Sequence, residues 1–116
     1  LKHSFTSKPI EVKQAFKRIA KYKTDHVVCH NDLNPKNILF SHMIKLIDWE
    51  YATINDRYFD LASLCVEFEF NKREEITFLQ AYFGRSSKVD REKLDAYKVI
   101  YTTLCAQWFE LNERES

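Results

Sequence analysis

The chain has 116 residues, of which 45% are hydrophobic and 30% charged, and its formal net charge is +1. This length and apolar content suffice for one domain with a modest core. A net charge so close to zero creates no strong field of one sign, so composition gives no support for binding to nucleic acid or a membrane surface. Because the sequence also lacks a long apolar run and a secretory signal pattern, we expect a cytoplasmic location.

Cysteine and glycine usage sets two further expectations. Cys29, Cys65 and Cys105 lie far apart in apolar segments without a CxxC spacing, which is typical of buried thiols in a reducing compartment. The chain has a single glycine, Gly84, and begins with Leu1 rather than Met. We therefore expect that it is a piece of a longer polypeptide.

The first predicted element is an amphipathic helix. It starts at Pro9, a residue favoured in the first turn of a helix, and it ends near Lys23. Apolar residues recur along it at helical spacing, namely Val12, Ala15, Phe16, Ile19 and Tyr22.

Three short β-rich runs follow, at residues 27–29, 37–40 and 44–47. The link at Ser41 and His42 is tight enough to join the last two runs as a hairpin. A loop from His30 to Lys36 then connects the first run to this hairpin, and Asp48 falls just past its end. Loops fixed between strands are where catalytic groups are commonly carried.

The second half of the chain is predicted to be helical. After a loop from Ala52 to Tyr58, residues 59–68 are apolar nearly all round, which indicates a helix buried on several sides. The next helix has a capping pair at its start, Asn71 with Glu74, and it stops at Gly84.

A last long helix opens at Asp90. No repeat or internal boundary divides the sequence, so residues 1–116 are expected to form a single α+β domain that is mostly helical.

The stretch from Cys29 to Tyr51 concentrates the residues that carry chemistry. Asp32 and Asn37 share one loop, and the hairpin brings Asp48 back toward them. One amide oxygen and one carboxylate suit Mg²⁺, whereas zinc would want more nitrogen and sulfur. Asp32 is then available to accept a proton from an attacking hydroxyl. The structural alternative is that Asp48 caps a turn and Asn37 closes the loop.

Two motifs in this stretch resemble a known superfamily. Residues 30–37, HNDLNPKN, resemble the HxDxxxxN catalytic loop of protein kinases and aminoglycoside phosphotransferases, and IDWEY at 47–51 resembles the metal-binding segment that follows it. The form of the second motif is more similar to choline and ethanolamine kinases, including the bacterial LicA-like ones, than to antibiotic kinases. The residues after it that share this likeness are Asn55, Arg57, Phe59, Asp60 and the segment CVEF at 65–68.

The resemblance implies a fold of two lobes with different functions. The chain is similar to the C-terminal lobe of a protein-kinase-like fold, in which a small β-hairpin carries the catalytic and metal-binding loops. In this superfamily an N-terminal lobe with a glycine-rich loop and a strand lysine binds ATP. With one glycine and few residues before the catalytic loop, this chain is expected to lack that lobe and to be inactive or nearly so in isolation.

The resemblance also implies a reaction and its residues. The reaction is ATP-dependent phosphorylation of the choline hydroxyl to give phosphocholine, with Asp32 as the base and Mg²⁺ on Asn37 and Asp48. His30 would brace the catalytic loop, and Asp60 would hold the loop's backbone.

For the substrate, the resemblance implies a pocket of carboxylates and rings around the quaternary ammonium group. Such a cation cannot donate a hydrogen bond, so negative charge and π faces recognise it. The alternative for the two aromatic residues of this set is packing in the core. The set comprises Glu50, Tyr51, Glu67 and Trp108.

Two other classes of function remain open. One is a kinase for another alcohol or amine, such as an aminoglycoside, ethanolamine or thiamine. The other is a non-catalytic choline-binding module, against which the set of Asp32, Asn37 and Asp48 argues because a binder does not need it. The expected partners are a small-molecule substrate, ATP and the N-terminal lobe of the parent chain, with neither nucleic acid nor a membrane among them.

Overall fold

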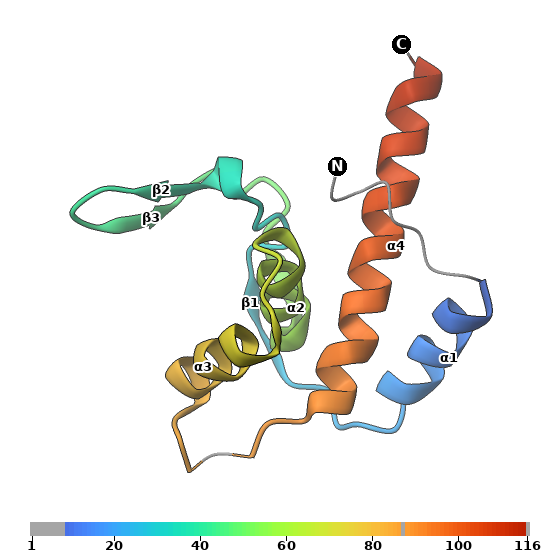
Figure 1. The fold of residues 1–116 in the computed structure, drawn as a ribbon. Coiled ribbons are helices and arrows are strands. Elements are labelled where there is room, and N and C mark those ends of the chain that lie inside the picture. Colours follow the sequence, from blue (N-terminus) through green and yellow to red (C-terminus); the bar gives the residue numbers. More distant parts are fainter. Residues whose placement is uncertain (1–8, 87, 116) are drawn as a thin grey trace.

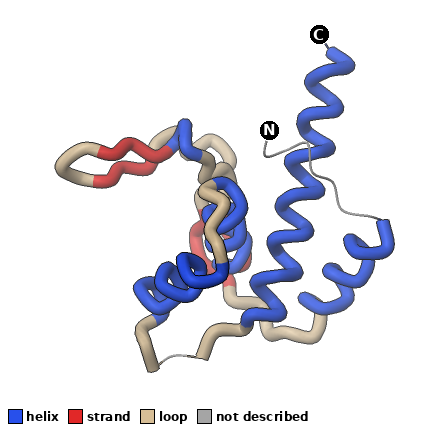
Figure 2. Tube along the Cα trace, viewed as in Figure 1, coloured by secondary structure: helices blue, strands red, loops and turns tan. Residues whose placement is uncertain are grey.

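Helices make up most of the computed structural model, which describes residues 9–86 and 88–115 (Figure 2). The α+β, mostly helical class predicted from the sequence is confirmed. No helix in these ranges combines the length and the apolar character that a membrane crossing requires. In chain order the elements are α1 (Pro9–Ile19), β1 (His26–Cys29), the 3-10 helix η2 (Pro35–Asn37), β2 (Ile38–Phe40), β3 (Ile44–Leu46), β4 (Thr53–Asp56), α2 (Arg57–Glu67), α3 (Lys72–Phe83) and α4 (Arg91–Glu115).

Two separate antiparallel pairs of strands hold the central stretch. Strand β2 pairs with β3 as the predicted hairpin, and β1 pairs with β4, with Val28 opposite Ile54. The sequence predicted a loop from Ala52 to Tyr58, so the prediction at β4 was wrong. Asn55 and Asp56 have low strand propensity, and this segment becomes a strand because β1 supplies its hydrogen-bond partners.

The helix boundaries follow the capping signals in the sequence. At the start of α3 the Asn71 side chain accepts a hydrogen bond from the Glu74 amide, and the Glu74 side chain accepts one from the Asn71 amide, both at 2.9 Å. Gly84 ends this helix with φ of 93°, a conformation that glycine adopts without penalty. Helix α1 ends at Ile19, earlier than the predicted end near Lys23.

Helix α2 lies at the centre of the molecule, beside β1 and against α4 (Figure 1). Its Leu61 and Ala62 form one apolar cluster with Leu79 of α3 and Leu94 of α4. Each such leucine contributes about 1.5–3 kcal/mol through burial. On the other side of α4, helix α1 packs through Ala15. The β2–β3 hairpin, by contrast, projects away from the helices (Figure 1).

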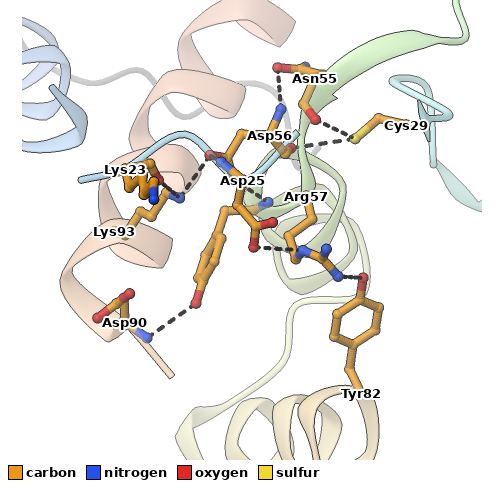
Figure 3. A network of polar contacts seen from close by, with 10 residues as sticks. Lys23, Asp25, Cys29, Asn55, Asp56, Arg57, Tyr82, Asp90 and Lys93 are labelled. Atoms are coloured by element: carbon orange, nitrogen blue, oxygen red, sulfur yellow. Dashed lines mark hydrogen bonds and ion pairs between the residues drawn. The ribbon is translucent and has the colours of Figure 1, made fainter. Parts of the chain in front are cut away.

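Asp56, the N-cap of α2, is the centre of a buried polar network (Figure 3). Its carboxylate accepts hydrogen bonds from the Tyr58 amide at 2.9 Å and the Asp25 amide at 3.0 Å. It also forms an ion pair with Lys93 Nζ of α4 at 2.7 Å, and both side chains are less than 5% exposed. These contacts fasten β4, α2 and α4 together at one point.

We expect Lys93→Met to lower the free energy of unfolding by about 3–5 kcal/mol, because it leaves the Asp56 carboxylate buried without its cation. Urea denaturation measures the change. The control is Arg18→Met, which removes an exposed pair with Glu92 at 3.9 Å and is expected to cost less than about 1 kcal/mol. Equal losses in the two variants would show that the buried pair does not hold the elements together.

Candidate active site

The loop that follows β1 is attached to helix α2 through the carboxylate of Asp60. One oxygen accepts a hydrogen bond from the His30 amide at 2.7 Å, and the other accepts one from the Asn31 amide at 3.0 Å. Asn31 has φ of 68°, a left-handed conformation that asparagine tolerates better than most residues. Because two consecutive amides point at one carboxylate, the start of the loop is fixed to a buried helix.

His30 joins this loop to the segment after the hairpin. Its Nδ1 accepts a hydrogen bond from the Asp32 amide at 3.1 Å, so the ring proton lies on Nε2, which donates to the Ile47 carbonyl at 2.7 Å. The ring is 1% exposed and packs against Trp49, with 4.7 Å between the ring centroids. Since both nitrogens are engaged by the backbone, His30 serves the site by positioning the loop.

The half-buried Asp32 carboxylate is oriented by two neighbouring amide side chains. Asn34 Nδ2 donates to Oδ1 at 3.1 Å, and Asn37 Nδ2 donates to Oδ2 at 3.0 Å. Asn37 Nδ2 also donates to the Asp32 carbonyl at 2.8 Å. The loop therefore presents one carboxylate in a fixed direction, which is the geometry that a general base requires.

The Ile47 amide donates to the Asn37 carbonyl at 2.9 Å, which brings the backbone of the next residue, Asp48, close to Asn37. Asn37 uses its Nδ2 on Asp32, and its Oδ1 accepts no hydrogen bond from any described residue. Asp48 is exposed and has φ of 59°, a strained conformation of the kind found at functional sites.

An amide oxygen and a carboxylate are hard donors that fit Mg²⁺. Among the described residues no group of three or more His, Cys, Asp and Glu side chains could hold a metal. An ion held by Asn37 and Asp48 would need its other ligands from water or phosphate oxygens.

Asn31 and Asn55 are site residues that sequence reasoning did not single out as functional. Asn55 Nδ2 donates to Asn31 Oδ1 at 3.0 Å, and Asn31 Nδ2 donates to the Tyr51 carbonyl at 2.9 Å. This chain of amides ties the IDWEY segment to the catalytic loop. No spacing rule could reveal it, because Asn55 reaches the loop only through the unpredicted pairing of β1 with β4.

The predicted substrate residues fall into an exposed and a buried group. Glu50 is exposed, and Tyr51 and Trp108 are 56% and 60% exposed. Neither ring packs in the core, so the core-packing alternative does not hold in this structure. The described residues show no ring contact between Tyr51 and Trp108; Trp108 instead contacts Phe109.

Glu67, the buried member of the set, is 3% exposed at the end of α2. It accepts a hydrogen bond from the Tyr101 hydroxyl of α4 at 2.5 Å. The charges of Glu67 and Asp32 both raise the pKa of the Cys105 thiol, although burial is the larger cause. Glu67 is therefore a buried acid through which α2 is joined to α4.

The fold and these contacts define a protein-kinase-like phosphotransferase lobe. In this lobe Asp32, whose carboxylate is held by neighbouring amides, and the oxygen donors Asn37 and Asp48 lie around the ends of the β2–β3 hairpin. The model of the phosphotransferase enzyme family matches residues 3–97, and the chain belongs to this family.

The chain is similar to LicA proteins in both sequence and structure. It is 32% identical over 115 residues to the LicA homolog of Mycoplasma capricolum, covering 90% of this chain and 47% of that protein. The choline kinase LicA from Streptococcus pneumoniae matches with a TM-score of 0.82 at 38% identity, covering 92% of this chain and 39% of that one. A structure of LicA in complex with AMP matches with a TM-score of 0.81 at 38% identity, with coverage of 92% and 38%.

The predicted resemblance to choline kinases of the LicA type is thus confirmed, and the chain spans less than half the length of these relatives.

We expect Asp60→Ala to loosen the catalytic loop, because it leaves the amides of His30 and Asn31 without an acceptor. Each buried donor that loses its partner costs about 1–3 kcal/mol. Hydrogen exchange of the peptide spanning residues 27–37 should become faster, and Asp95→Ala, at an exposed position of α4, should leave it unchanged. Unchanged exchange in Asp60→Ala would contradict this role.

Proposed function

We propose that the protein to which this chain belongs transfers the γ-phosphoryl group of ATP to the hydroxyl of choline. The observations that carry the proposal are an aspartate held in one direction, Asp32, and a buried acid, Glu67, in the same domain. The first arrangement suits a base that activates a hydroxyl. The second suits a cation attached to that hydroxyl.

In the proposed reaction Asp32 accepts the proton of the choline hydroxyl as the hydroxyl oxygen attacks the γ-phosphorus of ATP. The bond from that phosphorus to the β–γ bridging oxygen breaks, and ADP leaves. Asn34 and Asn37 hold the carboxylate in place, and His30 keeps the loop in register with the segment after the hairpin. Mg²⁺ on Asn37 and Asp48 would neutralise the charge of the phosphate oxygens.

The proposed substrate pocket separates the two ends of choline. The trimethylammonium group lies near Glu67, with Glu50, Tyr51 and Trp108 closing the exposed side. A cation over an aromatic face gains about 0.5–2 kcal/mol, more as water is excluded. The Tyr51 carbonyl is bonded to Asn31 of the loop, and the rings of Tyr51 and Trp108 are both exposed, so they are accessible to a ligand.

The relatives support both halves of this proposal. The S. pneumoniae neighbour is a choline kinase, and another LicA structure contains AMP. All three cysteines are free thiols, which fits action in the reducing, ATP-containing cytoplasm.

We expect Asp32→Asn in the full-length protein to lower turnover by about 10²–10⁴-fold, because the amide cannot accept the hydroxyl proton. Choline affinity should change little, because the cation is held elsewhere. Phosphocholine formation measures the first effect, and calorimetric titration with choline measures the second. Asp95→Asn serves as the control. A variant that keeps full turnover, or that loses choline binding in parallel, would contradict the assignment.

The 116 residues alone are expected to show little or no turnover. The chain contains one glycine and covers 39% of the solved choline kinase, so we propose that groups outside it orient the nucleotide. Such orientation accounts for about 7–11 kcal/mol of a reaction barrier. Assays of the isolated chain and the full-length protein at equal concentration test this, with circular dichroism to verify folding. Equal rates would contradict the proposal.

A further inference from the structure

One face of α4 runs from the core to the proposed cation site. Tyr101, Cys105 and Trp108 are spaced by four and three residues, so they share this face of the helix. Their exposure increases along the chain, from 6% at Tyr101 to 60% at Trp108. Tyr101 therefore lies at the buried end of a surface whose open end carries a proposed substrate residue.

The hydroxyl of Tyr101 is held against Glu67 by packing of its ring. The ring meets Phe59 edge-on, with centroids 5.8 Å apart and an interplanar angle of 77°. From this position the hydroxyl donates to Glu67 Oε2 at 2.5 Å, in surroundings where both residues are almost fully buried. Hydrogen bonds to an ionised acceptor are short and roughly twice as strong as neutral ones.

Electrostatic effects around this pair agree with its geometry. Burial, followed by the hydrogen bond to Glu67, raises the pKa of Tyr101, so the hydroxyl keeps its proton and remains a donor. Burial is the main reason that the pKa of the Cys105 thiol is raised, and the negative charge of Glu67 adds to this rise. Tyr101 thus stabilises the carboxylate without adding a positive charge of its own.

A second buried glutamate among the described residues, Glu75, is held by charged partners. Glu75 forms ion pairs with Arg91 at 2.5 Å and Lys98 at 2.8 Å, so two cations tie α3 to α4. A bound cationic ligand near such a group would meet repulsion from both partners. The hydroxyl that holds Glu67 gives rise to no such repulsion, because it carries no charge.

We propose that Tyr101 is a positioning residue for the cation site, whose hydroxyl fixes the Glu67 carboxylate in the direction from which it meets a quaternary ammonium group. The inference rests on the proposed function, which assigns Glu67 to the substrate cation. A trimethylammonium group offers no hydrogen bond with which to orient the carboxylate itself. The orientation must therefore come from the protein, and Tyr101 provides it.

The test compares Tyr101→Phe with Tyr97→Phe in the full-length protein. Tyr97 lies one turn earlier on α4, is half-buried, and donates its hydroxyl to none of the described residues, so it is a matched control. With Mg²⁺ and ATP saturating, Tyr101→Phe should raise the KM for choline about ten- to hundredfold. The KM for ATP and kcat should stay within twofold of wild type, and Tyr97→Phe should change none of the three.

A double-mutant cycle separates positioning from a general structural role. Glu67→Gln should itself raise the KM for choline, and adding Tyr101→Phe should cause no further increase, because Tyr101 acts only through Glu67. Tyr101→Phe could lower the melting temperature more than Tyr97→Phe does. In that case the double-mutant cycle and a choline titration without nucleotide still distinguish positioning of Glu67 from a general loss of stability.

Three results would overturn the inference alone: a KM for choline in Tyr101→Phe equal to that of Tyr97→Phe, an equal rise in the KM for ATP, or additive effects in the cycle. Failure of the wild-type protein to use choline would instead overturn the proposed function, and this inference with it.

Discussion

The two hydrogen bonds from consecutive amides to the Asp60 carboxylate are the constraint on which the site depends. They fix the start of the catalytic loop to α2, the helix that also carries much of the core. Because α2 is packed against α4, the loop takes its position from the helical core of the molecule. Without this anchor the Asp32 carboxylate would lie on a surface loop and could adopt many orientations. A general base must keep one orientation toward the proton that it accepts.

From this anchor, backbone-directed bonds assemble the remaining parts. His30 connects the loop to the Ile47 carbonyl, and the Ile47 amide connects back to Asn37. The two ends of the β2–β3 hairpin are thereby joined into one unit, although the hairpin itself projects away from the core (Figure 1). The proposed cation site is also organised by a hydrogen bond between elements, because Tyr101 of α4 donates its hydroxyl to Glu67 of α2. Residues outside the proposed reacting groups thus determine where those groups lie.

The sequence predicted those features that depend on local spacing. The hairpin, the capping box of α3, the stop at Gly84 and the kinase-like loop all follow from residues a few positions apart. It failed at β4, whose strand character comes from pairing with β1, and it did not predict that Tyr101 holds Glu67 from 34 positions away. The Asn31–Asn55 contact was missed for the same reason. Long-range partners are chosen by the folded arrangement of elements, which local propensity does not encode.

We propose that a base held by the α2 anchor serves phosphoryl transfer to choline. The most direct measurement supplies the full-length protein with ATP, Mg²⁺ and an equimolar mixture of choline, ethanolamine and an aminoglycoside, and identifies the phosphorylated products by ³¹P NMR. We expect phosphocholine as the main product, formed in step with ATP consumption. A phosphorylated aminoglycoside as the main product, or ATP consumption that does not depend on choline, would contradict it.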